Sequence, residues 1–200
     1  MDASVGFNSL QTTPATTSDI RQRIWLELQR APHDRHHEWR TPLLSSVDQQ
    51  AQPQARMVVL RGVDTLARTF QIYTDSRSPK VAELDDNPSA ALTFWSKRLS
   101  WQLRVSALAT VQRSGPEVDA AWAKVRQSRA AGDYLSLLAP GEVLGDTTTT
   151  DEVLADPQPA QQHNLAIINL QVVVIDWLEL APSGHRRATL QADAWQWLVP

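Results

Sequence analysis

The chain of 200 residues is long enough for one domain with extensions, and its hydrophobic fraction of 42% can supply a substantial core. A formal net charge of −3 gives no general attraction to nucleic acid, and no apolar run is long enough to predict a transmembrane helix. The absence of cysteine excludes disulfides, thiolate metal sites and cysteine nucleophiles.

The N-terminal part of the sequence predicts an arm followed by a helix. Residues 1–17 are rich in Ser, Thr and Ala and lack the basic and apolar regions of a secretory signal, so we expect a flexible arm and a cytoplasmic protein. A helix should follow, capped by Ser18 or Asp19 and ended by Pro32. Its apolar stripe is expected to pack across the mouth of a barrel.

Three histidines follow this helix. His33 and His37 would have the spacing of two metal ligands if they were helical, with His36 between them. Pro32 disfavours a helix at this point, and no cysteine or further histidine cluster follows. We therefore favour a solvated polar connection and predict no metal site.

Strand-like segments come next. Residues 43–48 predict a first strand, and residues 55–63 predict the strongest strand of the chain, with residues 69–74 as its hairpin partner. In a regular strand Arg56 and Arg61 point to opposite faces, unless a β-bulge intervenes.

A short helix with a basic start is expected after these strands. Ser78 has the character of an N-cap with Pro79 at the first helical position, and Asn87 marks the end. Arg77 and Lys80 flank the positive end of the helix dipole. The two positive charges and the helix N-terminus together favour a phosphate site. The alternative is that both are ordinary surface charges.

The next segment predicts a hairpin and then another helix. Residues 89–96 and 101–111 are rich in β-formers, and Ser114 opens a capping-box pattern. Basic residues lie in and beyond the last turn of that helix, among them Arg126 and Arg129. We favour complementation of the helix dipole over ligand contact for these charges.

The C-terminal third predicts a long loop at residues 139–162 and then more strands. Residues 164–180 suit one bent strand or two short ones, and residues 185–191 and 194–199 suit an antiparallel pair. We expect one domain over residues 18–200, mainly β, built as an antiparallel, Greek-key-like β-barrel with flanking helices.

The order and spacing of these motifs resemble the pyridoxamine 5'-phosphate oxidase family of FMN-binding split barrels, over about residues 39–200. The segment RMVVLR is similar to the family strand that lines the flavin, and WQLRV is similar to the motif of its flavin-binding glutamine. Lys80 matches the lysine of the family's Ser-Arg-Lys phosphate motif, Pro79 replaces its arginine, and Arg77 is a candidate to supply the missing charge. The FMN-binding residues that the resemblance implies are Arg56, Met57, Val58, Val59, Arg61, Tyr73, Thr74, Arg77, Lys80, Gln102, Trp177 and Arg187.

The resemblance is weaker for the substrate site. His185 in SGHRR matches a substrate residue of the family, whereas Ser183 stands where the family has an arginine that helps to hold the substrate. The family's Arg-Pro-x-x-Ser stretch has only nearby counterparts. The substrate-binding candidates are Arg61, His185, Arg126 and Arg129, and no catalytic residue is assigned.

The function that the resemblance implies is that of an FMN-dependent oxidoreductase similar to pyridoxamine/pyridoxine 5'-phosphate oxidase, with an altered substrate. The expected partners are a small molecule, with a phosphorylated B6 vitamer as one candidate, and a second copy of the chain, with FMN at the dimer interface. No nucleic-acid or membrane partner is expected. The alternatives are a non-catalytic FMN carrier or sensor and a ligand-free structural barrel.

Overall fold

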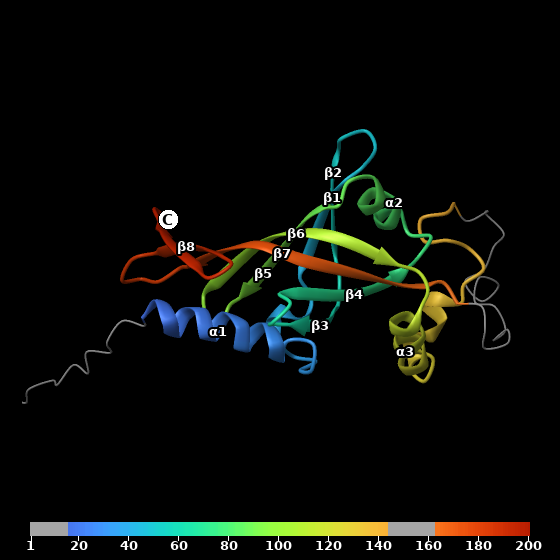
Figure 1. Cartoon of the computed structure of the whole chain (residues 1–200), viewed down its shortest axis with the longest axis horizontal. Helices are drawn as coiled ribbons and strands as arrows, with labels where there is room; N and C mark the ends of the chain where they lie inside the picture. The colour runs from blue at the N-terminus through green and yellow to red at the C-terminus, as the bar shows by residue number, and fades with distance from the viewer. Residues whose placement is uncertain (1–15, 144–162) are drawn as a thin grey trace, which may run out of the picture.

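The structure is a computed structural model that describes residues 16–143 and 163–200. Figure 1 shows an elongated molecule with a central sheet, one long helix beneath it and smaller helices at the end away from the C-terminal hairpin. The elements are α1 (Thr17–Arg30), η1 (Glu38–Arg40), β1 (Leu43–Val47), β2 (Pro53–Met57), β3 (Leu60–Asp64), β4 (Thr69–Asp75), α2 (Pro79–Asp86), β5 (Ser89–Ser96), β6 (Trp101–Gln112), α3 (Pro116–Val125), η2 (Arg129–Tyr134), β7 (Leu165–Glu179), β8 (Arg186–Gln191) and β9 (Ala194–Leu198).

The described strands form one antiparallel sheet whose two end strands are consecutive in the chain. Its order is β2-β1-β5-β6-β7-β4-β3, with β8 and β9 added beside the far part of β7. The two end strands, β2 and β3, are consecutive in the chain and are joined by Val58 and Val59. This two-residue link brings the two ends of the order together, as the curvature of a split barrel requires.

One continuous strand over residues 55–63 was therefore a wrong prediction. The chain leaves β1 after Met57 and pairs with β4 from Leu60 onward, because one segment must serve both edges of the closed sheet. The bulge that the sequence allowed is confirmed by a register shift between Leu60 and Gly62, which falls at Arg61.

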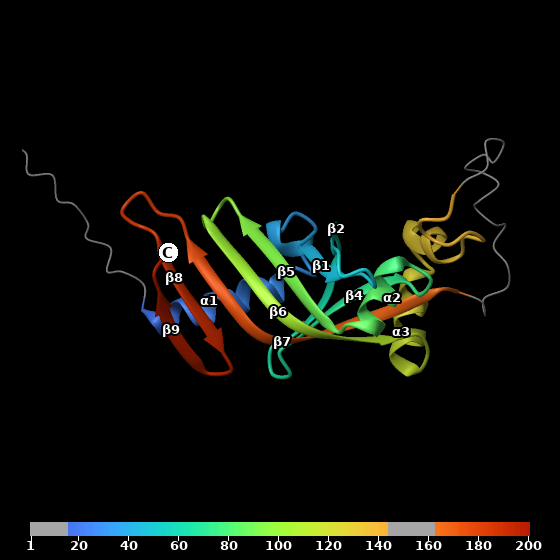
Figure 2. The same ribbon diagram turned by 90° about the horizontal axis from the view of Figure 1, so that it is seen from above.

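The long strand β7 joins the barrel to the C-terminal hairpin. One edge pairs with β6, while the other pairs first with β4 and then, from Ile175, with β8. A register shift opposite Ser106 and Ala107 marks the bend in this strand. Of the two predicted alternatives, one bent strand or two short ones, the structure has the first. Figure 2 shows β5, β6 and β7 side by side, with the β8–β9 hairpin beyond β7.

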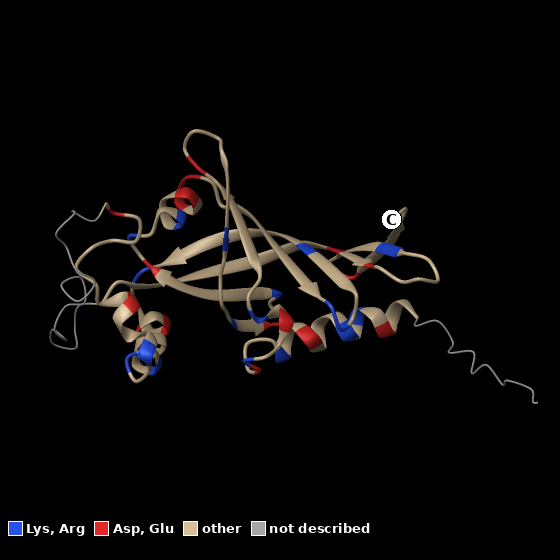
Figure 3. Ribbon diagram, turned by 180° about the vertical axis from the view of Figure 1, so that it is seen from behind, with Lys and Arg blue, Asp and Glu red and all other residues tan. Residues whose placement is uncertain are grey.

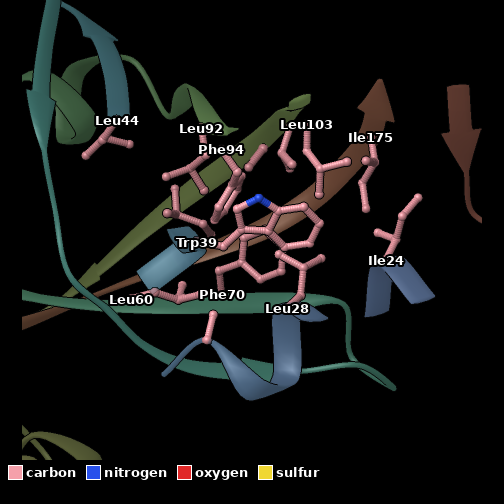
Figure 4. Close-up of a cluster of buried hydrophobic side chains, with 14 of the residues drawn as sticks. Ile24, Leu28, Trp39, Leu44, Leu60, Phe70, Leu92, Phe94, Leu103 and Ile175 are labelled. Carbon is pink, nitrogen blue, oxygen red and sulfur yellow. The ribbon is translucent and has the colours of Figure 1, made fainter. Parts of the chain in front are cut away.

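The core fills the barrel and the space between the sheet and α1. Trp39, Phe70 and Phe94 are fully buried, and their rings meet edge to face within it. Figure 4 shows Ile24 and Leu28 of α1 lying against this cluster, as the predicted apolar stripe required. The α1 cap is Thr16, whose side chain completes a capping box with Asp19, so the predicted cap at Ser18 or Asp19 was two or three residues too late.

The smaller helices lie near the end of the barrel that is opposite to the C-terminal hairpin. Helix α2 starts and ends as predicted, with Ser78 as its N-cap and Asn87 as its C-cap. The expected capping box at Ser114 does not form, because Gly115 is the N-cap with a φ of 105° and no side-chain cap bond is made. Most of the loop predicted at 139–162 lies outside the described residues.

The architecture confirms the predicted fold class, a mainly β antiparallel split barrel with few helices. No helix among the described residues is long and apolar enough to cross a bilayer.

Candidate functional site

The chain brings basic and hydroxyl side chains together where α2 covers the rim of the barrel. Lys80 donates from Nζ to Thr74 Oγ1 at 3.0 Å and to Ser78 Oγ at 2.5 Å. Arg56 of β2 donates to Ser46 Oγ and, at 2.8 Å, to Glu83 Oε2. We call Ser46, Arg56, Thr74, Ser78, Lys80 and Glu83 the rim cluster.

The rim cluster has more positive charge than its own carboxylate neutralises. Burial, and then the nearby charge of Arg56, lower the pKa of the Lys80 ammonium. Lys80 makes no ion pair with an acidic residue in the described part of the chain, and Glu83 is already engaged by Arg56 and Ser46. Figure 3 shows acidic and basic positions together on α2. Two cations with hydroxyl donors beside a helix N-terminus fit the phosphate group of FMN.

Arg77 has different surroundings from those that the sequence predicted. Its Nη2 lies 2.7 Å from Asp75 Oδ2 and its Nε lies 3.1 Å from Asp75 Oδ1. The same guanidinium donates to the carbonyl oxygens of Ser136, Leu137 and Leu138 at 3.0, 3.1 and 3.2 Å. All of its nitrogens are engaged, so Arg77 clamps the 136–138 segment onto the β4–α2 turn.

Three other predicted FMN residues lie on the far part of the sheet. Arg187 makes a two-point contact with Asp176, with Nε–Oδ1 at 3.0 Å and Nη2–Oδ2 at 2.7 Å, and Arg104 contacts the same carboxylate. Burial opposes ionisation of Asp176, but the hydrogen bonds from the two arginines outweigh it and lower its pKa. Gln102 lies beside this group, opposite Leu178 of β7.

Trp177 lies with Gln102, Arg104, Asp176 and Arg187, and we call these five residues the distal group. The Trp177 side chain is buried, with 0% exposure. Its ring centroid lies 5.3 Å from that of Trp101 and 5.9 Å from that of Trp195. Within this chain no face of the ring is open to stack on a flavin, so contact between Trp177 and FMN stays a prediction.

The two groups of predicted FMN residues are far apart in one chain. Thr74 of the rim cluster pairs with Ala166 of β7, and Trp177 lies eleven residues farther along the same strand. At about 3.3 Å per residue this separation is about 36 Å along the strand. The rim cluster and these distal residues therefore lie at opposite ends of β7 in one chain.

The predicted substrate residues are divided in the same way. Arg61 lies on the bulge of β3 with its guanidinium 5.7 Å from the centre of the Tyr73 ring. Arg126 and Arg129 are exposed near the end of α3. His185 lies in the turn before β8, at the distal group, next to Gly184 with a φ of 123°.

Some residues of these groups escaped the sequence analysis. Glu83 lies three residues after Lys80, so helical spacing could have placed it on the same face. Ser46 carried no signal, because only the pairing of β1 with β2 brings it beside Arg56.

The histidines do not form a metal centre in the described residues. His37 Nε2 lies 2.9 Å from Glu27 Oε2, and no group of three or more metal-ligating side chains occurs in residues 16–143 and 163–200. His37 instead tethers the segment after α1.

Comparison with known families identifies the central part of the chain. Residues 21–113 match the model of the pyridoxamine 5'-phosphate oxidase, FMN-binding domain. A pyridoxine/pyridoxamine 5'-phosphate oxidase from Azorhizobium caulinodans is 32% identical over 82% of this chain and 81% of its own length. The enzyme of that name from Chromohalobacter salexigens is 32% identical over 64% of this chain and 57% of its own.

Solved structures have the same fold at lower sequence identity. A pyridoxamine 5'-phosphate oxidase-related, FMN-binding protein from Nostoc punctiforme is 20% identical with a TM-score of 0.71, covering 93% of this chain and 100% of its own. PhzG from Burkholderia lata, solved with tetrahydrophenazine-1-carboxylic acid, is 18% identical with a TM-score of 0.67, covering 98% of each chain. At these identities the likeness concerns the fold alone.

Proposed function

Because the chain belongs to the pyridoxamine 5'-phosphate oxidase family and carries its FMN-binding domain, we propose that it is an FMN-dependent oxidoreductase acting on a small molecule. FMN, when bound, supplies the redox chemistry by accepting the electrons of the substrate. The protein supplies binding, orientation and exclusion of water.

The observation that supports this proposal best is the rim cluster. Lys80 and Arg56 contribute charge, and Thr74, Ser78 and Ser46 contribute hydroxyls, from four elements that are separate in sequence. These groups would hold the phosphate of FMN. Lys80 is half-buried, and its only hydrogen-bond partners in the described residues are two hydroxyls. Burying an unpaired charge destabilises a protein, so this lysine favours a ligand-binding barrel over a ligand-free one.

We also propose a homodimer in which each FMN is contacted by both chains. The rim cluster and the distal group with Arg187 lie about 36 Å apart along β7. If both groups contact FMN, as the resemblance implies, they must come from different chains.

The substrate is proposed to differ from that of the biosynthetic oxidase. His185 and Arg61 are present, but Ser183 offers one hydroxyl where an arginine would offer a charged fork. A less charged or smaller molecule than pyridoxamine 5'-phosphate fits this set better. The absence of a positive charge at position 183 also supports the second candidate, an FMN carrier or sensor without turnover.

One set of measurements tests the proposal. The purified protein should be yellow, hold about one FMN per chain and migrate as a dimer. Oxygen consumption with pyridoxine and pyridoxamine 5'-phosphates should be slow but present in an oxidase and absent in a carrier. A colourless protein that takes up no added FMN would refute the cofactor assignment for this chain and the function with it.

A further inference from the structure

The turn between β5 and β6 is held by a side chain from outside its own hairpin. Glu38 Oε1 accepts from the backbone N–H of Lys97 at 3.0 Å, and Glu38 Oε2 accepts from that of Arg98 at 3.3 Å. The same carboxylate accepts from the hydroxyl of Ser96, whose Oγ accepts from the backbone N–H of Leu99 at 3.2 Å. One residue of η1 therefore satisfies the donors of a turn that lies 59 and 60 residues later in the chain.

Two other hairpin turns satisfy their donors locally. Asp64 Oδ1, at the end of β3, accepts from two backbone N–H groups of the β3–β4 turn at 2.9 and 2.8 Å. Asp48 Oδ1 does the same for the β1–β2 turn at 3.0 and 2.8 Å. An acidic side chain within the turn is the ordinary device, because it bonds to the backbone a few residues ahead. The Glu38 clamp differs because it fixes a turn relative to another element of the fold.

This clamp has an anchored base. Trp39, next to Glu38, is fully buried, and its ring meets that of Phe94 of β5 edge to face at 6.1 Å. His37 Nδ1 accepts from the backbone N–H of Trp39 at 3.1 Å, and His37 Nε2 lies 2.9 Å from Glu27 Oε2. The Glu38 carboxylate therefore projects from a fixed segment, as a residue that positions others must.

A second carboxylate holds a side chain of the same turn. Glu27 of α1 is 5% exposed, and its Oε2 accepts from Arg98 Nη2 at 2.7 Å. Burial opposes ionisation of Glu27, but the hydrogen bonds from Arg98 and His37 outweigh it and lower its pKa. The β5–β6 turn is thus tied to α1 as well as to η1.

The residues that this turn places belong to the far part of the sheet. Strand β6 begins at Trp101, directly after the turn, and its second residue is Gln102 of the distal group. Ser100 has a φ of 53°, a conformation that is costly for a residue with a side chain and persists only with support from its surroundings. Its carbonyl accepts from the backbone N–H of Leu180 at 2.9 Å. A displacement of the turn therefore passes directly to Gln102.

We propose that Glu38 is a positioning residue for cofactor binding, which acts through the β5–β6 turn to hold Gln102 where it binds FMN. The carboxamide of Gln102 can donate to or accept from the polar atoms of a flavin, and its usefulness depends on its place. This inference rests on the proposed function. It adds a residue that lies before the segments that resemble the family.

The test is a double-mutant cycle on Glu38 and Gln102, read as FMN affinity. The FMN-free full chain is titrated with FMN, and quenching of flavin fluorescence gives the Kd. Gln102→Ala should weaken binding by roughly two- to tenfold, the share of one uncharged hydrogen bond. Glu38→Ala should weaken it by a similar factor, because Gln102 is then misplaced. The two substitutions combined should weaken binding no more than Gln102→Ala alone.

Two further variants separate positioning from general stability. Asp64→Ala removes the carboxylate clamp of the β3–β4 turn, so it should lower the urea midpoint about as much as Glu38→Ala but leave the Kd for FMN unchanged. Glu38→Gln keeps one carbonyl acceptor for the turn and should recover part of the affinity. It takes the place of Glu38→Ala in the cycle if the alanine variant does not fold. The visible circular dichroism of bound FMN should change in the same way in Glu38→Ala and Gln102→Ala.

The failures of the two proposals are distinguishable. A wild-type protein that takes up no FMN overturns the proposed function, and this inference with it. FMN binding that Gln102→Ala does not weaken overturns this inference alone, as do additive losses in the double variant. An equal loss of FMN affinity in Asp64→Ala would assign the effect to stability and would also overturn it.

Discussion

Arg56 and Glu83 meet across the barrel rim, with Arg56 Nη2 2.8 Å from Glu83 Oε2, although one lies in β2 and the other in α2. Ser46 contacts both side chains from β1. This contact fixes the guanidinium of Arg56 beside Lys80 before any ligand arrives. The rim cluster is therefore preorganised, and its parts can be tested one at a time.

Glu83→Gln should reduce the stability of the FMN-free protein by about 1–3 kcal/mol, because Arg56 and Ser46 lose a buried charged acceptor. Urea unfolding measures this change. The loss should shrink when FMN is in excess, since a phosphate would replace the missing negative charge. Exposed Glu117→Gln is the control, and an equal effect of both variants would contradict the role of Glu83.

Lys80→Met should weaken FMN binding by roughly ten- to a hundredfold, because a hydrogen-bonding charge on the phosphate is lost while the aliphatic packing is kept. Flavin fluorescence quenching on titration gives the affinity. Lys97→Met changes an exposed lysine in the β5–β6 turn and should have no effect. Equal affinities of Lys80→Met and wild type would place the phosphate elsewhere.

Arg77→Lys should leave FMN affinity within a few-fold of wild type but expose the 136–138 segment to protease. The reason is that the guanidinium is occupied by Asp75 and three carbonyls, and an ammonium cannot reach all of them. Limited proteolysis with mass spectrometry locates the cut. A large loss of FMN affinity with unchanged proteolysis would restore Arg77 as a phosphate ligand.

Asp176→Asn should flatten the acid dependence of stability. Hydrogen bonds from Arg187 and Arg104 lower the pKa of the Asp176 carboxyl in the folded state. Such a carboxyl stabilises the folded state when the pH is above its pKa in the unfolded chain, which is about 3.9. This stabilisation disappears as the pH falls through the lower pKa of the folded state.

The effect of Asp176→Asn at pH 7 should be about 1 kcal/mol, because Arg104 is half exposed and its share is screened by water. Urea midpoints at pH 7 and pH 3 should differ less in the variant than in the wild type. Exposed Asp193→Asn serves as the comparison. The same pH dependence in Asp176→Asn and wild type would show that this ion pair contributes nothing.

Ser183→Arg should raise the turnover of pyridoxamine 5'-phosphate if the rest of the pocket is intact, because it restores a charged fork for the substrate. The wild type should be a poor oxidase of this compound in an oxygen-consumption assay. Efficient turnover by the wild type, not improved by Ser183→Arg, would show that this position does not limit activity. The wild-type rate decides, since the freedom of Gly184 can also disorder a new arginine.

The sequence alone determined the local structure and the family. Alternation located the strands, Ser78 and Pro79 located the start of α2, and the order of short motifs indicated an FMN-binding split barrel, because these signals depend on neighbouring residues. The prediction from sequence failed where one segment of the chain pairs first with one strand and then with another. Nothing in residues 56–63 indicates that the chain crosses between the two edges of the sheet after Met57.

Only the tertiary structure decided which charges are available to a ligand. Arg77 and Lys80 are equivalent as basic residues at a helix start, yet Arg77 is held by Asp75 and the 136–138 carbonyls, while Lys80 faces hydroxyls. The rim cluster and the distal group also became separate sites only when β7 placed them at its two ends. The physical reason is that the partners of a side chain are set by strand pairing and chain closure between distant residues, and spacing along the chain does not encode them.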